Sequence, residues 1–375
     1  MEPKGMRING LQGNVLHIAN YEAAYRGNFV QSLDLLSDKL EKEKVKSYYI
    51  FPVQKEDSPA MGWMQELLSK KRITGWLSGS VAEDAVLIRH VIRKRKIALI
   101  HTHFISMQHY LSVRMAAQFT DVRIIMHFHN HSTEAFGMKN MLRRKIYDNC
   151  EMIACSESVY QNLLRDYPSN KKYSIDNGVD YSRFDINSRA GRNEYELQEN
   201  STVCLIFGFD FYRKGVDLAL KALQSLNEKG GNYELLISLS KNFDYVNQEI
   251  TKILGDIPQW VHVIKARPDV EALYNLSDIF LSPSREEGLP YSVLEAAYFD
   301  CTVVTSDISA QVNIDVPYKY VHISENTDSL SEAIRNAAEV KDEKSAKLDE
   351  VRSFLISRHG VARWTEDIMR IYKNE

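Results

Sequence analysis

Short apolar runs alternate with amphipathic helical patterns along nearly the whole chain. The run at 14–19, for example, is followed by Phe29, Leu33, Leu36 and Leu40 at the spacing of one helix face. Runs of this kind predict buried strands at residues 14–19, 46–51, 97–104, 123–131, 152–156, 202–208, 233–238, 260–265, 278–281 and 302–306. Because strands and helices alternate in both halves, we expect parallel sheets whose strands are joined by crossover helices.

The length and one polar stretch indicate how the chain divides. With 375 residues, the chain is long enough for two domains of ordinary size. The polar stretch 187–201 predicts the linker between them. The short apolar segment 73–77 fits either a strand or a helix, and helical patterns run from about Leu330 to the end.

The composition is that of a soluble globular protein, with 44% hydrophobic and 26% charged residues. No stretch approaches the roughly 18 consecutive apolar residues of a membrane span. No apolar signal core follows Met1. The four cysteines form no C-x-x-C pair, which favours a reduced, cytoplasmic setting and argues against a zinc site.

The net charge of −3 conceals an asymmetry between the halves. Residues 1–185 hold 26 Lys/Arg against 20 Asp/Glu, or +6, and residues 186–375 hold 21 against 30, or −9. A basic first half suits an anionic partner such as a phospholipid surface or a lipid diphosphate, and an accidental imbalance is the alternative. The helix predicted at 81–96 also has a basic side. This side suits contact with lipid headgroups, but it is more simply explained as a solvated face.

One segment combines a strand, a glycine-containing loop and the start of a helix. The apolar run 278–281 leads into a polar loop with Gly288, and Pro290 suits the first position of a helix. The free N–H groups and the dipole of a helix N-terminus favour a phosphate. The carboxylates of Glu287 and Glu295 can each accept a pair of sugar hydroxyls. The segment therefore suits a nucleotide sugar, although two glutamates this far apart are more often solvated charges.

Two cations follow the strand that opens the second half. That strand ends at Gly208, and Arg213 and Lys214 precede the next helical pattern. Arg can bind a phosphate bidentately and Lys as a point charge. Solvated charges are the weaker alternative, because positive charge at a helix start opposes the dipole. The chain contains no G-x-G-x-x-G, which weakens the case for a dinucleotide oxidoreductase.

The strands predicted at 97–104 and 123–131 both end in histidines. These histidines are His101, His103, His127, His129 and His131. The carboxyl ends of strands are where open α/β sheets bind ligands. Five histidines there could hold a metal ion, but only if further ligands converge in space, which the sequence does not show.

Three motifs together resemble those of the retaining family-4 glycosyltransferases. They are Glu287-x7-Glu295, the segment Asn177-Gly-Val-Asp near the end of the first half, and Gly208…Lys214-Gly. The resemblance covers nearly the whole chain and implies the GT-B fold, an α/β architecture of two facing Rossmann-like domains with a cleft between them. The chain departs from the family pattern at Phe209, where Arg is usual, and at 300–302, where Gly-x-Pro is usual.

The resemblance also implies domain limits. The N-terminal, acceptor-side domain would comprise residues 1–186 together with a C-terminal helix at about 358–375 that crosses back to it. The nucleotide-sugar domain would comprise 187–357.

The resemblance assigns roles in the donor site. Glu287 would contact the donor sugar and Glu295 would hold the ribose hydroxyls. Cationic side chains and helix amides, rather than a metal ion, would stabilise the leaving diphosphate. The donor-binding residues implied are Gly208, Arg213, Lys214, Arg267, Gly288, Leu289, Tyr291, Ser292 and Glu295. In the first domain, His129 would position the donor sugar or the acceptor, and Gly27 would lie in the acceptor-side loop.

The expected activity is the transfer of a hexosyl or N-acetylhexosaminyl group, with retention, from a UDP-sugar to a glycan or lipid-linked acceptor. We expect this to occur in the cytoplasm, peripherally on the inner face of a bacterial membrane, during surface polysaccharide synthesis. No cofactor, metal ion or nucleic acid is expected. Two alternatives stay open, a sugar-nucleotide epimerase of the GT-B fold and a non-catalytic partner subunit that binds sugar nucleotides. The changes at Phe209 and at 300–302 keep the second one open.

Overall fold

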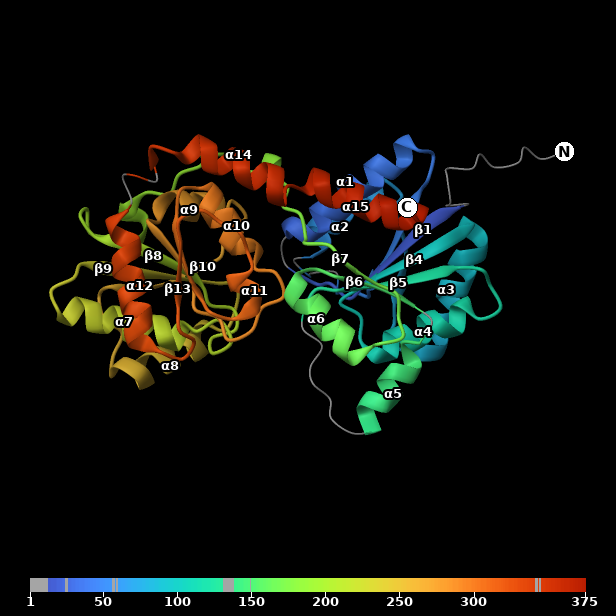
Figure 1. Ribbon diagram of the computed structural model, residues 1–375, viewed down its shortest axis with the longest axis horizontal. Coiled ribbons are helices and arrows are strands. Elements are labelled where there is room, and N and C mark those ends of the chain that lie inside the picture. The colour runs from blue at the N-terminus through green and yellow to red at the C-terminus, as the bar shows by residue number, and fades with distance from the viewer. Residues whose placement is uncertain are drawn as a thin grey trace. The chain divides into compact units, whose positions relative to one another are not determined.

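The computed structural model describes residues 13–23, 26–55, 58, 60–130, 138–148, 150–340, 343 and 345–375. The chain forms two compact units, shown in Figure 1. Unit 1 comprises Met1–Gly178 and Val361–Glu375, and unit 2 comprises Val179–Gly360. The division expected from the sequence, at 186/187 and 357/358, lies a few residues from these borders.

Unit 1 is built on a seven-stranded sheet in the order β3-β2-β1-β4-β5-β6-β7, with every pair parallel. In chain order, the strands are β1 (Asn14–Ala19), β2 (Ser47–Pro52), β3 (Ile73–Leu77), β4 (Ile97–His103), β5 (Arg123–Phe128), β6 (Glu151–Ala154) and β7 (Lys172–Ser174). The helices are α1 (Gly27–Lys42), α2 (Met61–Ser69), α3 (Val81–Arg95), α4 (Met107–Ala117), α5 (Met138–Ile146), α6 (Glu157–Asp166) and α15 (Val361–Lys373).

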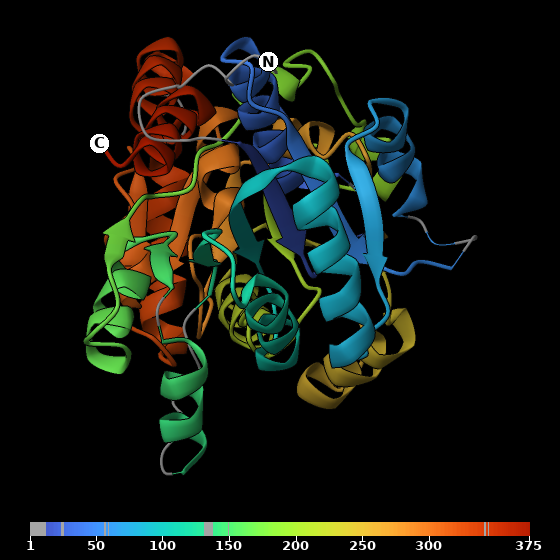
Figure 2. The same ribbon diagram turned by 90° about the vertical axis from the view of Figure 1, so that its right-hand side faces the viewer.

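Alternate residues of β1 face opposite sides of this sheet, as the period of a strand requires. Val15 joins a core with α1, α2 and α15, whereas Leu16 and Ile18 join a second core with α3 and α4. The C-terminal helix α15 lies beside α1 in both views (Figures 1 and 2). The expected return of the C-terminal helix to the first domain is therefore confirmed, although it begins at Val361, after Gly360 has ended the preceding helix.

Unit 2 repeats this plan with a six-stranded parallel sheet in the order β10-β9-β8-β11-β12-β13. Its strands are β8 (Thr202–Phe207), β9 (Tyr233–Leu239), β10 (Val261–Lys265), β11 (Ile279–Ser282), β12 (Thr302–Ser306) and β13 (Lys319–His322). Its α-helices are α7 (Val216–Glu228), α8 (Phe243–Leu254), α9 (Glu271–Leu276), α10 (Tyr291–Tyr298), α11 (Ser309–Val312), α12 (Thr327–Glu339) and α14 (Leu348–His359).

The prediction of parallel sheets with crossover helices is confirmed in both units. The ambiguous segment 73–77 is strand β3, and two edge strands, β7 and β13, were not predicted. In each sheet the strand order reverses direction once, between β1 and β4 in unit 1 and between β8 and β11 in unit 2. Ligands of open α/β sheets bind beyond the carboxyl ends of the strands at such a switch point, so these two places are where the site residues are sought.

Candidate functional site

The switch point of unit 2 is formed by two loops in close contact, one after β8 and one after β11. Gly215 has φ +71°, and a Cβ there would lie 2.0 Å from the carbonyl oxygen of Pro283, so only glycine fits. A Cβ on Gly208 would lie 2.7 Å from Cγ2 of Ile237 on the neighbouring strand. The amide of Arg285 donates to the carbonyl of Arg213 at 2.8 Å. Gly215 therefore lets the two loops pack together, and Gly208 lets the end of β8 pack closely against β9.

Glu287 lies at the centre of this junction and is 8% exposed. Its Oε1 accepts hydrogen bonds from Nζ of Lys214 at 2.6 Å and from Oγ of Ser284 at 2.9 Å. A guanidinium nitrogen of Arg213 lies 3.8 Å from the other carboxylate oxygen. The structure thus brings Glu287 next to Arg213 and Lys214, two consecutive residues that precede it by more than 70 positions in sequence.

Phe209 lies beside both cations. Its ring is half exposed, with Nζ of Lys214 4.6 Å and Cζ of Arg213 5.5 Å from its centroid. These are cation–π distances. The residue that departs from the family pattern therefore contacts both cations, which its sequence position alone did not indicate.

A second arginine fastens the loop after β11. Arg285 makes a bidentate pair with Asp217 at 2.8 and 2.9 Å and also binds Glu325. The bonds to Asp217 and Glu325 raise the pKa of Arg285 above its usual value. These contacts anchor the loop from outside and leave Arg213 and Lys214 as the cations next to Glu287.

Glu295, the second glutamate of the motif, is buried inside α10. Its Oε1 accepts from Arg183 at 2.7 Å and its Oε2 accepts from the hydroxyl of Tyr274 at 3.0 Å. Burial and the nearby carboxylate raise the pKa of Tyr274 well above its usual value, so this phenol is a neutral donor. The sequence did not indicate either partner, since Arg183 and Tyr274 lie 112 and 21 positions away.

The start of α10 carries the remaining residues of the motif. The helix begins at Tyr291, and Pro290, expected as its first residue, is the N-cap residue one position earlier. Gly288 and Leu289 are buried in the turn before it, while Tyr291 and Ser292 are partly exposed in its first turn. The turn and the helix start are therefore placed where the sequence predicted them, next to Glu287.

Arg267 lies after β10 and is held by acidic and phenolic partners. It forms a bidentate pair with Asp269 at 2.8 and 3.0 Å and donates to Glu194 at 2.6 Å and to Tyr195 at 3.0 Å. The bonds to Asp269 and Tyr195 raise the pKa of Arg267. This arginine is fixed in place but is not in contact with the Glu287 group.

The switch point of unit 1 has a different chemistry, because it is lined by buried histidines. Nδ1 of His103 lies 3.2 Å from Nε2 of His129, and the amide nitrogen of Asn177 lies 3.4 Å from Nδ1 of His129. Burial lowers the pKa of His129 to about 3, so its ring is neutral at pH 7. A neutral ring can orient a hydroxyl but carries no charge to offer a phosphate.

The other histidines are more closely grouped than the sequence suggested. His17, within β1, faces His101 of β4 in register and stacks against His103. Residues 17, 101, 103, 127 and 129 all lie at alternate strand positions on one face, a period-2 signal that a count of strand-end histidines misses. Among the described residues, the two groups of three that could hold a metal ion both come from this set, His17/His101/His103 and His103/His127/His129. His131 lies outside the described residues.

Gly27, the acceptor-side glycine, is the first residue of α1 and has φ +58°. A Cβ there would lie 3.1 Å from the hydroxyl of Tyr21, so the position is both strained and crowded for other residues. The preceding Arg26 binds Asp34 and Glu66. Gly27 therefore shapes the turn between β1 and α1, and no contact joins it to His129.

Comparison with known proteins identifies relatives of both units. The profile described as Glycosyl transferases group 1 matches residues 187–351, and the profile described as Glycosyltransferase Family 4 matches residues 31–183. Over 133 residues the chain is 34% identical to an uncharacterized glycosyltransferase of Haemophilus influenzae, covering 36% of this chain and 37% of that protein. Over 117 residues it is 31% identical to the lipopolysaccharide glucosyltransferase WaaG of Escherichia coli, covering 31% of each. The alignments thus span about a third of these curated relatives.

A solved structure extends the likeness to the whole chain. Alr3699/HepE of Anabaena, in complex with UDP and glucose, matches with a TM-score of 0.76 at 15% identity, covering 97% of this chain and 100% of that one. Identity this low supports the fold alone. With the two parallel sheets of seven and six strands, it confirms the GT-B fold expected from the motifs.

Proposed function

Because the chain belongs to the family-4, group 1 glycosyltransferases, we propose that it transfers a sugar from a nucleotide-sugar donor to a glycan or lipid-linked acceptor. The donor would be a UDP-sugar, with a hexosyl or N-acetylhexosaminyl group. In the reaction the anomeric carbon exchanges its bond to the diphosphate oxygen for one to an acceptor hydroxyl, whose proton passes to the leaving diphosphate. Retention at that carbon is part of the proposal and follows from the family resemblance.

The observation that carries the proposal is the Lys214–Glu287 pair at the switch point of unit 2. A buried carboxylate held by Lys214 and Ser284 is fixed in orientation and can accept hydroxyls of a sugar. Lys214 and Arg213 are then available to the diphosphate, whose developing charge they would stabilise without a metal ion. Amides at the start of α10, after Gly288, would add further donors.

The remaining residues fit this arrangement as donor or acceptor contacts. Glu295 would bind the ribose hydroxyls, and Arg267 would lie by the base. In unit 1, His129 would position the sugar or the acceptor, and Gly27 would belong to the acceptor side. Support for UDP comes from the Anabaena structure that holds UDP and glucose. Support for a surface-polysaccharide acceptor comes from the lipopolysaccharide glucosyltransferase of Escherichia coli.

The donor assignment is tested by calorimetric titration with UDP, GDP and ADP in EDTA. We expect UDP to bind most tightly, and Glu295→Ala to weaken binding by about 1.5–3 kcal/mol, as for a charged hydrogen bond. Arg183→Ala is the matched control, since it removes the internal partner of Glu295 but keeps the carboxylate. Equal losses in both variants would mean that Glu295 acts only through Arg183.

Rival functions predict different outcomes in the same preparation. A non-catalytic partner subunit would bind UDP-sugar but release no UDP with any acceptor. An epimerase would convert UDP-sugar without an acceptor. Acceptor-dependent release of UDP would support transfer over both.

A membrane position is also part of the proposal, and α4 supports it. Met107, Leu111 and Met115 recur every four residues along α4 and are exposed, and Phe119, two residues after α4 ends at Ala117, is 93% exposed. The neighbouring α3 carries exposed cations, and Arg89 on it donates to carbonyls at the end of α4. An apolar stripe next to cations suits the interface of an anionic bilayer. Among the described residues, no helix is long and apolar enough to span one.

Vesicle sedimentation tests this position. We expect the protein to sediment with vesicles containing anionic phospholipid and far less with neutral ones, and Phe119→Ser with Leu111→Ser to reduce binding about tenfold or more. Val321→Ser, at an exposed apolar residue of unit 2, is the control. Equal sedimentation with both vesicle types, or no sedimentation with either type, would contradict the proposed membrane position.

A further inference from the structure

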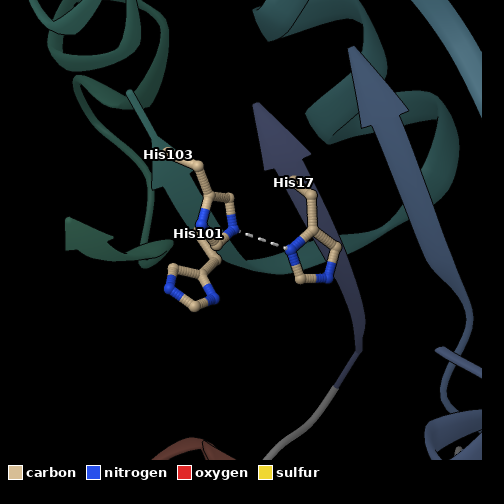
Figure 3. A group of neighbouring side chains, drawn as sticks. All are labelled: His17, His101 and His103. Carbon is tan, nitrogen blue, oxygen red and sulfur yellow. Dashed lines mark hydrogen bonds between the residues drawn. The ribbon is translucent and has the colours of Figure 1, made fainter. Parts of the chain in front are cut away.

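Three histidines of unit 1 lie close together on one face of the sheet, on the neighbouring strands β1 and β4 (Figure 3). They are His17, His101 and His103, and a nitrogen from each lies within 4.8 Å of a nitrogen of the other two. The register of the sheet brings them together, because His17 pairs with His101, and His103 lies two residues further along the same face. Each ring is 0% exposed.

The contacts within this group are poor hydrogen bonds. Nδ1 of His17 lies 3.4 Å from Nε2 of His103, beyond the roughly 2.7–3.2 Å of an ordinary N–H donor and acceptor pair. Two nitrogens each about 2.0–2.1 Å from a tetrahedral Zn²⁺ are separated by about 3.4 Å. The separation of this pair therefore fits two ligands of one ion, and the third nitrogen lies within 4.8 Å of both.

The hydrogen bonding of the group is also incomplete. Nε2 of His17 and Nε2 of His101 are buried and have no partner among the residues that the structure describes. Buried polar nitrogens are nearly always paired, because an unpaired one costs about 1–3 kcal/mol. Three imidazoles placed side by side with nitrogens left over are better explained by a shared ligand than by packing.

The rings are in the protonation state that a metal ion requires. Burial lowers the pKa of His17 to about 3 and lowers the pKa values of His101 and His103 well below the usual range. All three are therefore neutral near pH 7, with lone pairs that no proton occupies. Nearby Arg72 contributes to the lowering at His17, but its charge is balanced by Asp34, Asp38 and Glu41.

A hydroxyl from the C-terminal helix supports the group from outside. The hydroxyl of Tyr372, on α15, lies 2.6 Å from Nδ1 of His101. Tyr372 is 1% exposed and packs in the core that also contains Val15 and α1. This bond occupies Nδ1 of His101 and orients its ring, so Nε2 of His101 is the nitrogen left to bind a ligand.

The geometry points to a site for one divalent transition-metal ion of the Zn²⁺ class, held by His17, His101 and His103, with Tyr372 orienting the ring of His101. Imidazole donors suit Zn²⁺, Ni²⁺ and Cu²⁺, whereas Mg²⁺ and Ca²⁺ prefer oxygens. Because the site is closed and buried, the ion is structural and fastens α15 to the sheet of unit 1. The inference is independent of the proposed transfer reaction, which is expected to need no metal.

The overlapping group His103/His127/His129 is the less favoured location. Both ring nitrogens of His127 are also unpaired among the described residues. However, Nε2 of His129 lies 3.2 Å from His103, an ordinary hydrogen-bond distance, and its Nδ1 faces the amide nitrogen of Asn177. His101 and His127 nonetheless form a matched pair for a test. Their rings stack at 5.4 Å and 3° on adjacent strands, and both are buried. The two replacements therefore remove rings of the same size and burial, and that of His101 also removes its bond to Tyr372.

The experiment uses the tag-free, full-length protein refolded in chelator and then supplied with Zn²⁺ alone. We expect one Zn²⁺ per chain by elemental analysis, and a rise of roughly 5–10 °C in the melting temperature of unit 1 at a hundredfold excess over Kd. Mg²⁺ should give no rise. Co²⁺ in place of Zn²⁺ should give the visible absorption of a tetrahedral centre.

Variants decide which residues hold the ion. His101→Asn should weaken Zn²⁺ binding at least 100-fold and Tyr372→Phe about tenfold, while His127→Asn and the exposed His90→Asn should keep it. Less than half an equivalent of Zn²⁺ in the wild type would overturn the inference. So would loss of Zn²⁺ in His127→Asn but not in His101→Asn, which would place the ion in the other group, or loss only in His90→Asn, which would place it on the surface. The Co²⁺ spectrum of the wild type keeps the test decisive if His101→Asn does not fold.

Discussion

At the carboxyl ends of β1 and β4, unit 1 buries neutral imidazoles, and at the equivalent ends of β8 and β11, unit 2 buries ion pairs. Both places are switch points of parallel sheets with the same central order of strands. In unit 1, His103 contacts His17 and His129. In unit 2, Glu287 contacts Lys214 and Ser284. Topology therefore fixes where a ligand can bind, and the side chains decide which ligand it is.

The difference has a consequence for division of labour. Cations beside a carboxylate, as in unit 2, suit a diphosphate and a sugar together. Neutral imidazole rings, as in unit 1, can bind a metal ion through a nitrogen lone pair, and the ring of His129 can form a hydrogen bond with a hydroxyl. The difference would be contradicted if the stability and ligand binding of the two switch points changed equally on acidification, on removal of a charge or on removal of a ring.

Acidification should produce the largest difference in folding stability between the two units. The buried histidines of unit 1 have lowered pKa values, about 3 for His17 and His129, while their unfolded-state pKa is near 6.5. Protons thus bind the unfolded state preferentially, so stability is fully present above about pH 6.5 and is lost as the pH falls toward the folded pKa. Each such histidine should lower the free energy of unfolding by about 2 kcal/mol between pH 7 and pH 5, and the two together by about 4 kcal/mol.

Amide hydrogen exchange, resolved for individual peptides and carried out with chelator present between pH 7.5 and pH 5, measures this loss of stability in each unit separately. Unit 1 should lose protection first. Unit 2 has a lowered histidine pKa at His322 as well, which serves as the internal reference for a single buried ring. Simultaneous loss in both units would mean that the histidines of unit 1 are not neutral as a group.

Removing one charge from the pair in unit 2 should have the next largest effect. Lys214 and Glu287 have side chains only 11% and 9% exposed. Lys214→Ala therefore leaves a buried carboxylate with only the Ser284 hydroxyl and the more distant Arg213, and should cost about 3 kcal/mol of stability. It should also lower the rate of UDP release at least about 100-fold, as does loss of one stabilising donor. Lys221→Ala, an exposed lysine on α7, is the control.

A double variant separates the structural role of the pair from its proposed catalytic role. Lys214→Met with Glu287→Gln removes both charges and keeps an acceptor for Ser284, so most of the stability should return. The rate should stay low, since no cation or carboxylate is restored. Recovery of both stability and rate would show that the pair only holds the loops together.

The sequence predicted the elements of both switch points but not the contacts within them. Alternating apolar runs and helical patterns located most strands, and the glycines and glutamates of the motif located the loop before α10. Edge strands β7 and β13 were missed because they are three and four residues long and partly exposed. A short, half-exposed run carries too little periodicity to be recognised.

Contacts across large sequence separations could not be predicted at all. Arg183 reaches Glu295 across 112 positions, and His101 reaches Tyr372 across 271. Such pairs depend on how strands are ordered in the sheet and on where a helix returns, which a linear pattern does not encode. The histidine group was partly within reach, because strand alternation alone places His17 on the same face as Val15, and His101 on the same face as His103.

Replacing Phe209 should have the smallest effect on UDP affinity, and it tests whether the ring next to the two cations contributes to that affinity. Its ring lies under Lys214 at 4.6 Å and Arg213 at 5.5 Å. Because the ring is half exposed, each contact contributes about 0.5–1 kcal/mol. Phe209→Leu should therefore raise the Kd for UDP about two- to fivefold without changing stability much, and Phe209→Trp should hold or improve the affinity.

Phe209→Arg asks whether the ring replaces the arginine that is usual in the family. A third cation beside Lys214 and Arg213 would repel them in the free protein, yet it would attract a diphosphate once one is bound. If calorimetry shows tighter UDP binding and a lower melting temperature without ligand, the charged end of unit 2 is a diphosphate site in which an aromatic ring stands in for an arginine. If the arginine lowers both affinity and stability, the ring is required to hold the two cations, and the contrast with the neutral end of unit 1 depends on packing as much as on charge.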